Sequence, residues 1–420
     1  MLTRLGCEQL VLVGFSRTLL TALTDVLPPG SVLVVEEPDV AAKRDIPALA
    51  RRFPAVSRVL LWEYQRDGAV AALLRAAPAL TAARAVVPGI EYAVQPAAGL
   101  AAALGLPGAG ERAAGIFRDK VRQRRAAARS GLRNPAYAAV TTAEEAVGFF
   151  RRAGGRCIVK PTTRQASLGV RFVAGEAEVV EAVRAAEAAT EPLLVPARGI
   201  PSELLIERAL DGPEYSVEAL VRDSRVCFTN VTAKRVLPGP YPVELGHLVP
   251  GAPSPQLATR LAEHTSRLAA ESGFAYGVLH CEWIVDEEGP ALVECAARLP
   301  GDEIATLISL AYGFSFVGAY VSIMAGLRPS VCVEPRGAAA IRFLSAPPGS
   351  VREVLGLADA ARAAEVHAAT VSVAPGDVVR PLTSSWQRVG HVITRSVSAP
   401  AAERLSRRSA EQIAVRTEPA

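Results

Sequence analysis

Short apolar runs alternate with amphipathic stretches along the first hundred residues of the chain. Because strands that alternate with helical segments pair in parallel, this pattern predicts a βαβ unit built on a parallel sheet. Gly14 follows the first run, but the later glycines of a G-x-G-x-x-G dinucleotide turn are missing. We therefore expect an ordinary turn there and not a nicotinamide site. The predicted strands are Leu10–Val13, Ser31–Val35, Val56–Trp62 and Arg84–Val87.

The alternation of apolar runs with amphipathic stretches ends at the turn at Leu104–Gly108. An arginine-rich helix is predicted within Asp119–Pro135, where Gly131 and the Asn-Pro pair stop it. We expect its arginines to form a solvated helix face, and the alternative is that they bind an anion. Hairpins follow between residues 156 and 297, and short strands follow from residue 331 onward.

One uncharged stretch, Ile304–Leu327, is long enough to span a bilayer. Gly313, Ser315 and Gly318 divide it near its middle, so we expect two buried helices and no membrane partner. The N-terminal apolar stretch is interrupted by charged residues and lacks a small-residue cleavage site. Export is therefore not expected.

Composition narrows the classes of function. The chain has 420 residues, enough for about three domains. Its 46 basic and 42 acidic residues leave a net charge of +4, too even for a general polyanion-binding surface, so nucleic acid is not an expected partner. The six cysteines contain no C-x-x-C pair, which fits neither a disulfide framework nor a zinc knuckle. We expect six free thiols in a reducing cytoplasm.

Lysine is rare in this chain. Because arginine serves almost everywhere a cation is needed, a lysine marks a site that requires a compact ammonium group, and phosphate oxygens are one such requirement. The four lysines are Lys43, Lys120, Lys160 and Lys234.

The segment Cys157–Val173 is typical of a strand that ends in Lys160, a polar loop and a returning strand. Such a loop directs N–H groups and hydroxyls, here those of Ser167 and Gly169 among others, at phosphate oxygens. No G-K-[ST] string exists, so this is not a Walker A loop. A polar hairpin loop without a ligand is the alternative.

A second hairpin runs over Glu203–Val221. Glu214, Ser216 and Glu218 share one face of its second strand. Carboxylates on one strand face need hydrogen bonds from water or from a partner. Exposure at the surface would supply the first, and binding the hydroxyls of a ribose would supply the second.

A third hairpin, Gly277–Asp302, turns at an acidic D-E-E-G-P sequence. If it is centred on residue 288, Glu282 lies opposite Glu294 and Ile284 opposite Leu292. Like charges about 5 Å apart destabilise a hairpin, and a divalent cation between them removes that cost. Two carboxylates favour Mg²⁺ held partly through phosphate oxygens. The alternative is an exposed edge with solvated glutamates.

Two further pairs of residues are candidates for the same site. His280 and Arg298 lie at even-numbered positions, as Glu282 and Glu294 do. Because alternate residues of a strand face the same side, we expect them to face the same cleft. Upstream, Glu244 and His247 lie in a predicted loop bounded by proline and glycine, where a histidine is ordinarily a surface residue.

In series, these motifs resemble the ATP-grasp superfamily over Leu104–Pro329: Lys120, KPTTRQASLGV, LIERALDGPEYSVE and HCEWIVDEEGPALVECAARLPGD. Glu244, His247 and the string ECAARLPGD look most like the L-amino-acid ligases of the bacilysin-synthetase type. The resemblance implies an α/β chain with the ATP-grasp fold. It further implies a Rossmann-like N-terminal domain over 1–108, an ATP-grasp domain over 109–330 with subdomains of about 109–200 and 201–330, and a β-rich C-terminal domain over 331–420.

Carried over residue by residue, the resemblance implies a nucleotide site. Lys120 and Lys160 would contact ATP phosphates, and the loop Ser167–Gly169 would close over them. Glu207 would lie beside the adenine, and Glu214 would bind the ribose hydroxyls.

The resemblance also implies the reacting groups. Glu282 and Glu294 would hold Mg²⁺, and Arg298 would stabilise the phosphorylated and tetrahedral states. His247 would hold the reacting carboxyl group, and Glu244 would bind the substrate's amino group.

Two positions depart from the family pattern. Many relatives have asparagine at position 296, where this chain has Ala296, although alanine matches the amino-acid-ligase variant. Asp302 stands where the type member of that variant has a bulky aromatic residue, which implies an acceptor pocket of different size that attracts a cationic or amino-bearing acceptor.

These expectations describe an ATP-dependent carboxylate–amine ligase acting through an acylphosphate on amino-acid or other carboxylate substrates, in natural-product biosynthesis. A closing loop over Arg164–Gly169 is expected because water must be excluded. An ATP-grasp carboxylase or purine-pathway ligase, a nicotinamide oxidoreductase and a silent binding protein are the alternatives. A homodimer is compatible with the sequence.

Overall fold

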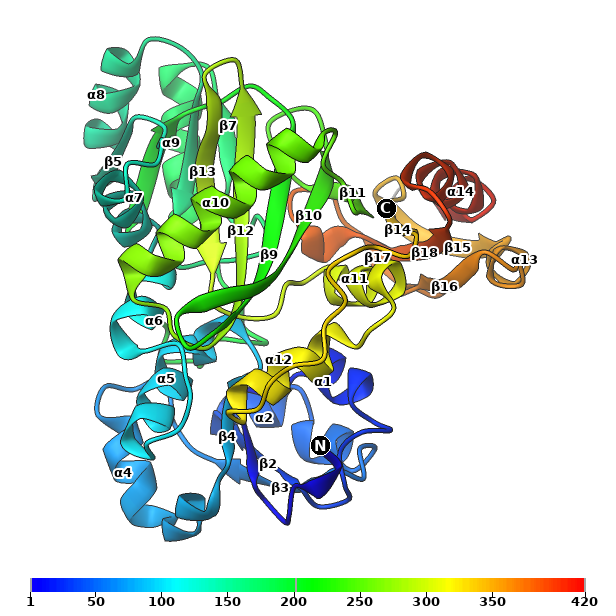
Figure 1. Ribbon diagram of the computed structural model, residues 1–420. Coiled ribbons are helices and arrows are strands. Elements are labelled where there is room, and N and C mark those ends of the chain that lie inside the picture. Colours follow the sequence, from blue (N-terminus) through cyan, green and yellow to red (C-terminus); the bar gives the residue numbers. More distant parts are fainter. Residues whose placement is uncertain (1, 201, 419–420) are drawn as a thin grey trace.

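The computed structural model describes residues 2–200 and 202–418. Its N-terminal part is a four-stranded parallel sheet in the order β3-β2-β1-β4, drawn in blue in Figure 1. The strands coincide with the apolar runs, so the predicted βαβ pattern is confirmed. They are β1 (Leu10–Val13), β2 (Val32–Glu36), β3 (Val56–Leu61) and β4 (Ala85–Pro88), and the helices of this part are α1 (Arg17–Ala22), α2 (Pro38–Lys43), α3 (Ile46–Ala50), α4 (Ala69–Ala76) and α5 (Val94–Ala103).

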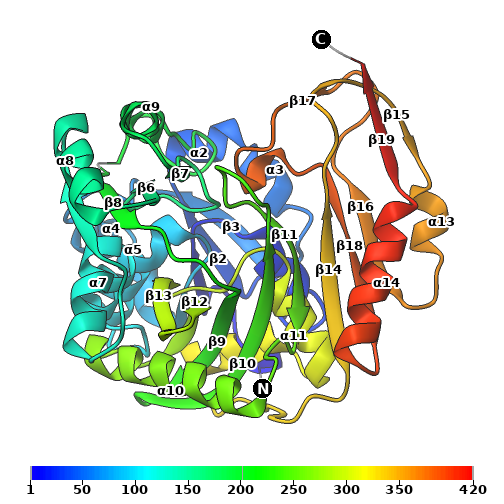
Figure 2. The same cartoon turned by 90° about the horizontal axis from the view of Figure 1, so that it is seen from above.

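An eight-stranded antiparallel sheet forms the centre of the molecule, in the order β13-β12-β9-β10-β11-β14-β18-β16. The last three strands in this order come from the C-terminal part, so one sheet continues across the boundary predicted near residue 330 (Figures 1 and 2). The strands are β9 (Glu214–Arg222), β10 (Arg225–Val236), β11 (Glu244–Val249), β12 (Gly277–Asp286), β13 (Gly289–Ala296), β14 (Ala338–Leu344), β16 (Val366–Val371) and β18 (Gly390–Ser396).

A smaller sheet, in the order β5-β8-β6-β7, lies beside the large one and is covered by two helices (Figure 2). We call this unit the lid. Its helix α8 begins at an N-cap, Thr142, and has glutamates in its first turn and arginines in its last, which suits the helix dipole. The elements of the lid are β5 (Tyr137–Val140), α8 (Ala143–Ala153), β6 (Cys157–Pro161), β7 (Arg171–Val173), α9 (Glu176–Glu187) and β8 (Leu204–Arg208).

Three helices cover one face of the large sheet. They are α6 (Glu111–Phe117), α7 (Lys120–Arg129) and α10 (Pro255–Ser272). The apolar side chains of α10, such as Leu261 and Leu268, pack against the fully buried Trp283 of β12 and its neighbours. The opposite, polar face of the strands is thereby left to form the site.

The uncharged stretch forms two helices, α11 (Ile304–Tyr312) and α12 (Phe316–Met324), which bend by 106° at Gly313–Ser315. Both helices are buried, as the sequence predicted, and they pack in the core between the N-terminal sheet and the large sheet. Among the described residues, no helix alone has the length and apolarity to cross a membrane, and only this bent pair together meets that test.

The C-terminal part adds a three-stranded sheet, in the order β17-β15-β19, to the end of the large sheet. Its helix α14 packs on β14 and β18 and so covers the extension of the large sheet. The remaining elements are β15 (Gly349–Leu355), α13 (Leu357–Ala361), β17 (Val378–Val379), α14 (Ala399–Glu411) and β19 (Ala414–Glu418).

Candidate active site

A cavity of about 460 Å³ lies between the lid and the polar face of the large sheet. All predicted site residues line it except Gly169 and Glu207. The N-terminal part contributes Thr18 to the wall, and the C-terminal part contributes Ser385, Trp386 and Arg388, none of which the sequence predicted. The predicted residues on the wall are Lys120, Lys160, Ser167, Glu214, Glu244, His247, Glu282, Glu294, Arg298 and Asp302.

Lys160 ends strand β6 and is held by a buried ion pair. Its Nζ lies 2.6 Å from Glu207, whose other oxygen accepts from Arg124. Burial opposes ionisation of Glu207, but Arg124 and Lys160 outweigh it and lower its pKa to about 2. Burial also lowers the pKa of Lys160, although Glu207 opposes that shift. Glu207 therefore lies behind the cavity wall, where it positions Lys160.

The arginine-rich helix α7 is not simply solvated. Arg124 is completely buried, so the expected solvated face is wrong for this residue. Asp119 caps the helix by accepting from the N–H of Arg122, which places Lys120 in the first turn. Lys120 Nζ donates to the carbonyl of Arg164, which lies in a loop of the lid (residues 164–170, the lid loop), and is 2.9 Å from Glu294. It thus joins the lid loop to the large sheet.

The lid loop, residues 164–170, turns sharply over the cavity. Ala166 and Ser167 both adopt positive φ (56° and 55°), which is uncommon for residues with a side chain. The hydroxyl of Ser167 donates to the carbonyl of Pro242. Gly169 is needed for packing, because a Cβ there would lie 2.9 Å from that of Ala189. It therefore shapes the loop without lining the cavity.

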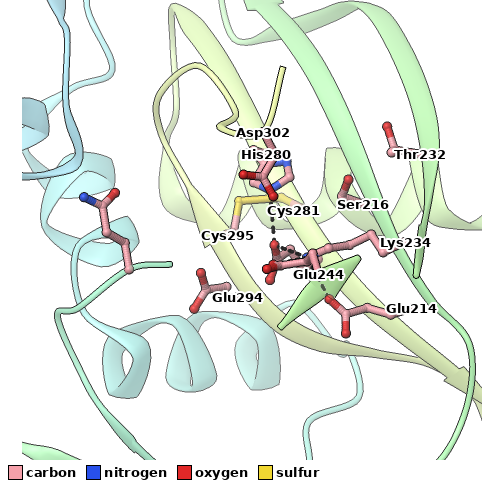
Figure 3. Close-up of polar contacts among 12 residues, drawn as sticks. Glu214, Ser216, Thr232, Lys234, Glu244, His280, Cys281, Glu294, Cys295 and Asp302 are labelled. Carbon is pink, nitrogen blue, oxygen red and sulfur yellow. Dashed lines mark hydrogen bonds and ion pairs between the residues drawn. A yellow bond between two sulfur atoms is a disulfide. The ribbon is translucent and has the colours of Figure 1, made fainter. Parts of the chain in front are cut away.

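Charged side chains from adjacent strands converge in the cavity, as Figure 3 shows. Lys234 of β10 is at their centre: its Nζ lies 2.7 Å from Glu214, 3.3 Å from Glu244 and 2.5 Å from Glu282. Burial lowers the pKa of Lys234, but the three carboxylates outweigh burial and raise it well above the ordinary value. Reasoning from the sequence did not assign Lys234 to the site, although the rarity of lysine was a signal for it.

Glu282 and Glu294 lie directly opposite each other in the β12–β13 hairpin, as predicted. The register slips by one residue after Glu282, so Ile284 pairs with Ala291 and not with Leu292 as predicted. The glutamate side chains are partly exposed (13% and 30%), so the alternative of a fully solvated edge is wrong.

Carboxylate oxygens are the ligands that Mg²⁺ prefers, so this pair fits the ion. Among the described residues, no group of three or more potential ligands could enclose a metal. Two carboxylates suit Mg²⁺ nonetheless, because this ion usually keeps several waters and takes further oxygens from substrate phosphates.

His280 fixes the orientation of Glu282. Its Nδ1 lies 2.9 Å from Glu218 and its Nε2 lies 3.2 Å from Glu282, so it faces the cleft as predicted. Burial lowers the pKa of His280, but the two glutamates outweigh burial and raise it to about 9. Glu218 is completely buried and also accepts from Ser216 and Thr232, so surface exposure, one of the two alternatives for these carboxylates, is wrong for Glu218.

Glu244 and His247 lie in strand β11 and not in a loop as predicted. The strand forms because residues 244–249 pair with β10 on one side and β14 on the other. His247 is buried, and its Nε2 lies 3.0 Å from Asp302. Glu244 accepts from the hydroxyl of Ser385 over 2.8 Å. The expectation of an ordinary surface histidine is therefore wrong.

Asp302 has no free oxygen for a cationic acceptor. Arg388 donates to both of its oxygens, and His247 contacts one of them. Burial opposes ionisation, but Arg388 and His247 outweigh it and lower the pKa of Asp302 far below the ordinary range. The attraction of a cationic acceptor to Asp302, expected from the sequence, is therefore not supported by this geometry.

Arg298 is held in place by Glu91, a residue that sequence reasoning missed. Arg298 Nε donates to Glu91 over 2.6 Å, and Arg118 donates to the other oxygen of Glu91 over 2.5 Å. Burial opposes ionisation of Glu91, but the two arginines lower its pKa to about 2. Glu91 begins a short turn after β4, and no sequence motif marked it.

A disulfide joins Cys281 and Cys295, the neighbours of the two paired glutamates (Figure 3). These cysteines are direct partners in the hairpin and both are buried. The expectation of six free thiols is therefore wrong for this pair, because spacing along the chain does not reveal a contact across a hairpin. Cys7, Cys157, Cys227 and Cys332 are free.

Comparison with known proteins identifies two domains in the chain and a shared fold. Residues 154–306 match the ATP-grasp domain model, and residues 342–418 match the L-amino acid ligase C-terminal domain 2. The crystal structure of L-amino acid ligase from Bacillus licheniformis aligns with a TM-score of 0.79 at 18% identity, over 97% of this chain and 98% of that one. At such identity the alignment shows a common fold.

Two curated relatives match over shorter lengths. An uncharacterised protein of Sinorhizobium fredii, y4rH, is 25% identical over 299 residues, which are 70% of this chain and 60% of the relative. The phosphoribosylamine–glycine ligase of Rhizobium meliloti is 27% identical over 288 residues, which are 63% of this chain and 66% of the relative. The chain thus spans less than two thirds of either relative. By these matches the chain contains an ATP-grasp domain over residues 154–306 and an L-amino acid ligase C-terminal domain 2 over residues 342–418, and its overall fold is shared with the Bacillus licheniformis L-amino acid ligase.

Proposed function

We propose that the protein is an ATP- and Mg²⁺-dependent ligase that joins the carboxylate of an amino acid to an amine and releases ADP and phosphate. One observation carries the proposal: lysines and carboxylates from the lid, the large sheet and α7 converge on a single cavity beside Glu244 and His247. A cavity of about 460 Å³ is within the usual size of a small-molecule site.

The nucleotide would bind between the lid and the sheet. Lys120 and Lys160 line the cavity, and their ammonium groups would neutralise phosphate oxygens. Glu207 keeps Lys160 in place, and Glu214 would accept hydrogen bonds from the ribose. Glu282 and Glu294 would hold Mg²⁺, which supplies charge neutralisation to the phosphates when it is bound.

In the first step a carboxylate oxygen of the substrate forms a bond to the γ-phosphorus of ATP. The bond from that phosphorus to the β-γ bridging oxygen breaks, and ADP leaves with both electrons. The guanidinium of Arg298, fixed by Glu91, would stabilise the charge of the resulting acylphosphate.

In the second step a neutral amine attacks the acyl carbon. The bond from that carbon to the phosphate oxygen breaks and phosphate leaves. The nitrogen gives one proton to the departing phosphate or to water, which leaves the amide. Glu244 would bind the substrate's amino group and His247 its carboxyl group. The lid loop would exclude water, which would otherwise hydrolyse the acylphosphate.

The proposal extends to the product and its setting. We infer a dipeptide-like natural product, made in the cytoplasm from free small molecules. The match to the L-amino acid ligase C-terminal domain supports the first part. Four of the six cysteines are free, as in a reducing compartment, and the Cys281–Cys295 disulfide is the exception.

The test is phosphate release from ATP and Mg²⁺ with amino acids supplied singly and in pairs. Release that requires a pair, with a product lighter than the pair by one water in mass spectrometry, is the expected result. Glu294→Gln should abolish it. Glu288→Gln is the matched control, because Glu288 lies in the turn of the same hairpin and its side chain is 78% exposed.

A second candidate is an ATP-grasp carboxylase or a purine-pathway ligase. The similarity to a phosphoribosylamine–glycine ligase favours it. Phosphate release with bicarbonate or a non-amino carboxylate, and none with any pair of amino acids, would establish this candidate and overturn the amino-acid ligase.

A further inference from the structure

A short segment of the C-terminal part, Ser384–Arg388, crosses the end of the cavity between β17 and β18. We call it the strap. The hydroxyl of Ser384 and the side chain of Gln387 form a capping box around the 3₁₀ turn Ser385–Gln387. Ser384 is only 1% exposed, so the strap is anchored and its neighbours are held in place.

The strap contacts three separate parts of the site. The N–H of Ser385 donates to the carbonyl of Ala166 in the lid loop over 3.2 Å. The Ser385 hydroxyl donates to Glu244, and Arg388 donates to Asp302. The guanidinium of Arg388 also lies over the ring of Phe343, 3.6 Å from its centroid. The strap therefore meets the lid loop and the predicted amino-acid site together.

Trp386 lines the cavity, and 57% of its surface is exposed. The other two tryptophans are in different settings: Trp283 is fully buried, and Trp62 donates from its indole to the carbonyl of Ala69. A large apolar ring left open on a cavity wall is a surface that a ligand can cover favourably.

The charged groups at this end of the cavity are already paired. Glu244 has Lys234 and Ser385, and Asp302 has Arg388 and His247. The substrate's amino and carboxyl groups would already take up the contacts that Glu244 and His247 offer. A further charge on the ligand side chain would have to break one of the remaining pairs, which is costly for partly buried groups. An apolar side chain would instead cover Trp386 without that cost.

We propose that the strap forms the side-chain subsite for an amino-acid substrate and that Trp386 selects apolar side chains there. The inference rests on the proposed function, because Glu244 and His247 would hold the amino and carboxyl groups of that substrate. Ser385 and Arg388 act as positioning residues for Glu244 and Asp302.

The kinetic test compares the wild type with Trp386→Ala on alanine, valine, leucine and phenylalanine. The variant should raise the KM for leucine and phenylalanine by about tenfold, while the KM for alanine and for ATP changes by less than about twofold. Trp62→Phe, which removes a tryptophan from the N-terminal part, should match the wild type. An equal loss on all four amino acids would overturn the inference.

A binding test separates this inference from the proposed function. Apolar amino acids, added with Mg²⁺ and a non-hydrolysable ATP analogue, should protect the exposed Trp386 from fluorescence quenching by acrylamide. Trp386→Phe gives the signal of the other tryptophans. If the wild type shows no ligase activity but amino acids still protect Trp386 from quenching, only the proposed function is overturned. If Trp386 stays unprotected at saturating amino acid, the subsite is overturned, even when the enzyme is active.

Discussion

Lys234 and Glu282 form an ion pair across an intervening strand. The Nζ of Lys234 on β10 lies 2.5 Å from Glu282 on β12, and β9 separates their strands. The same ammonium group contacts Glu214 on β9 and Glu244 on β11. One lysine thus holds together carboxylates predicted for the ribose, the metal and the amino group, and its charge keeps them from repelling one another.

Replacing Lys234 by glutamine should destabilise the fold by about 3 kcal/mol, because partly buried carboxylates lose their cation. Mg²⁺ should recover part of this loss, since it would bind Glu282 and stabilise the folded state by mass action. The measurement is the midpoint of thermal unfolding with and without Mg²⁺.

Lys43→Gln is the matched control for this variant. Lys43 is about one third exposed and pairs with Asp39 on the surface, so its loss should change stability by less than about 1 kcal/mol. If Mg²⁺ raised the midpoint of Lys234→Gln no more than that of the wild type, Lys234 would not be neutralising the metal carboxylates.

The sequence predicted local features of the site well. Glu282 faces Glu294 because a hairpin turn sets the register of nearby residues, and the two uncharged helices follow from glycines that break a helix. The error at Ile284 has the same local origin, since a bulge after Glu282 shifts the register by one residue.

Features built by long-range contacts were not predicted. Lys234 reaches Glu282 only because the large sheet places β9 between their strands, and Glu91 meets Arg298 from the N-terminal part of the chain. The strap reaches Glu244 because β14 and β18 extend the large sheet. Periodicity and spacing carry no information about which strands become neighbours after such crossovers.

Glu91→Gln should lower kcat for phosphate release by about tenfold to a hundredfold and leave the KM for ATP nearly unchanged. The variant keeps the shape of the side chain but removes the charge that fixes Arg298 and Arg118. Glu8→Gln, which removes an ion pair with Arg58 near the surface, should have wild-type kinetics. A rise in the KM for ATP with an unchanged kcat would assign Glu91 to nucleotide binding instead.

Glu207 should make stability depend on pH in the acid range. Its pKa falls from the ordinary 4.5 to about 2 on folding, so the ionised form stabilises the protein above about pH 4.5. That contribution, about 3 kcal/mol, is lost as the pH falls from about 4.5 to about 2. Urea unfolding of the wild type and Glu207→Gln across this range measures it. The stability difference between them should shrink toward acid pH, and a difference independent of pH would contradict the assignment.

The disulfide between Cys281 and Cys295 predicts a count of reactive thiols. In guanidinium chloride without reductant, an alkylating reagent should label only the four free cysteines, and prior reduction should expose all six. Intact-protein mass spectrometry gives both counts. Cys295→Ala should add one labelled thiol in the unreduced protein, because it frees Cys281. Labelling of all six cysteines without reductant would mean that the pair beneath the carboxylates is reduced, and Glu282 and Glu294 would then be held by the hairpin hydrogen bonds alone.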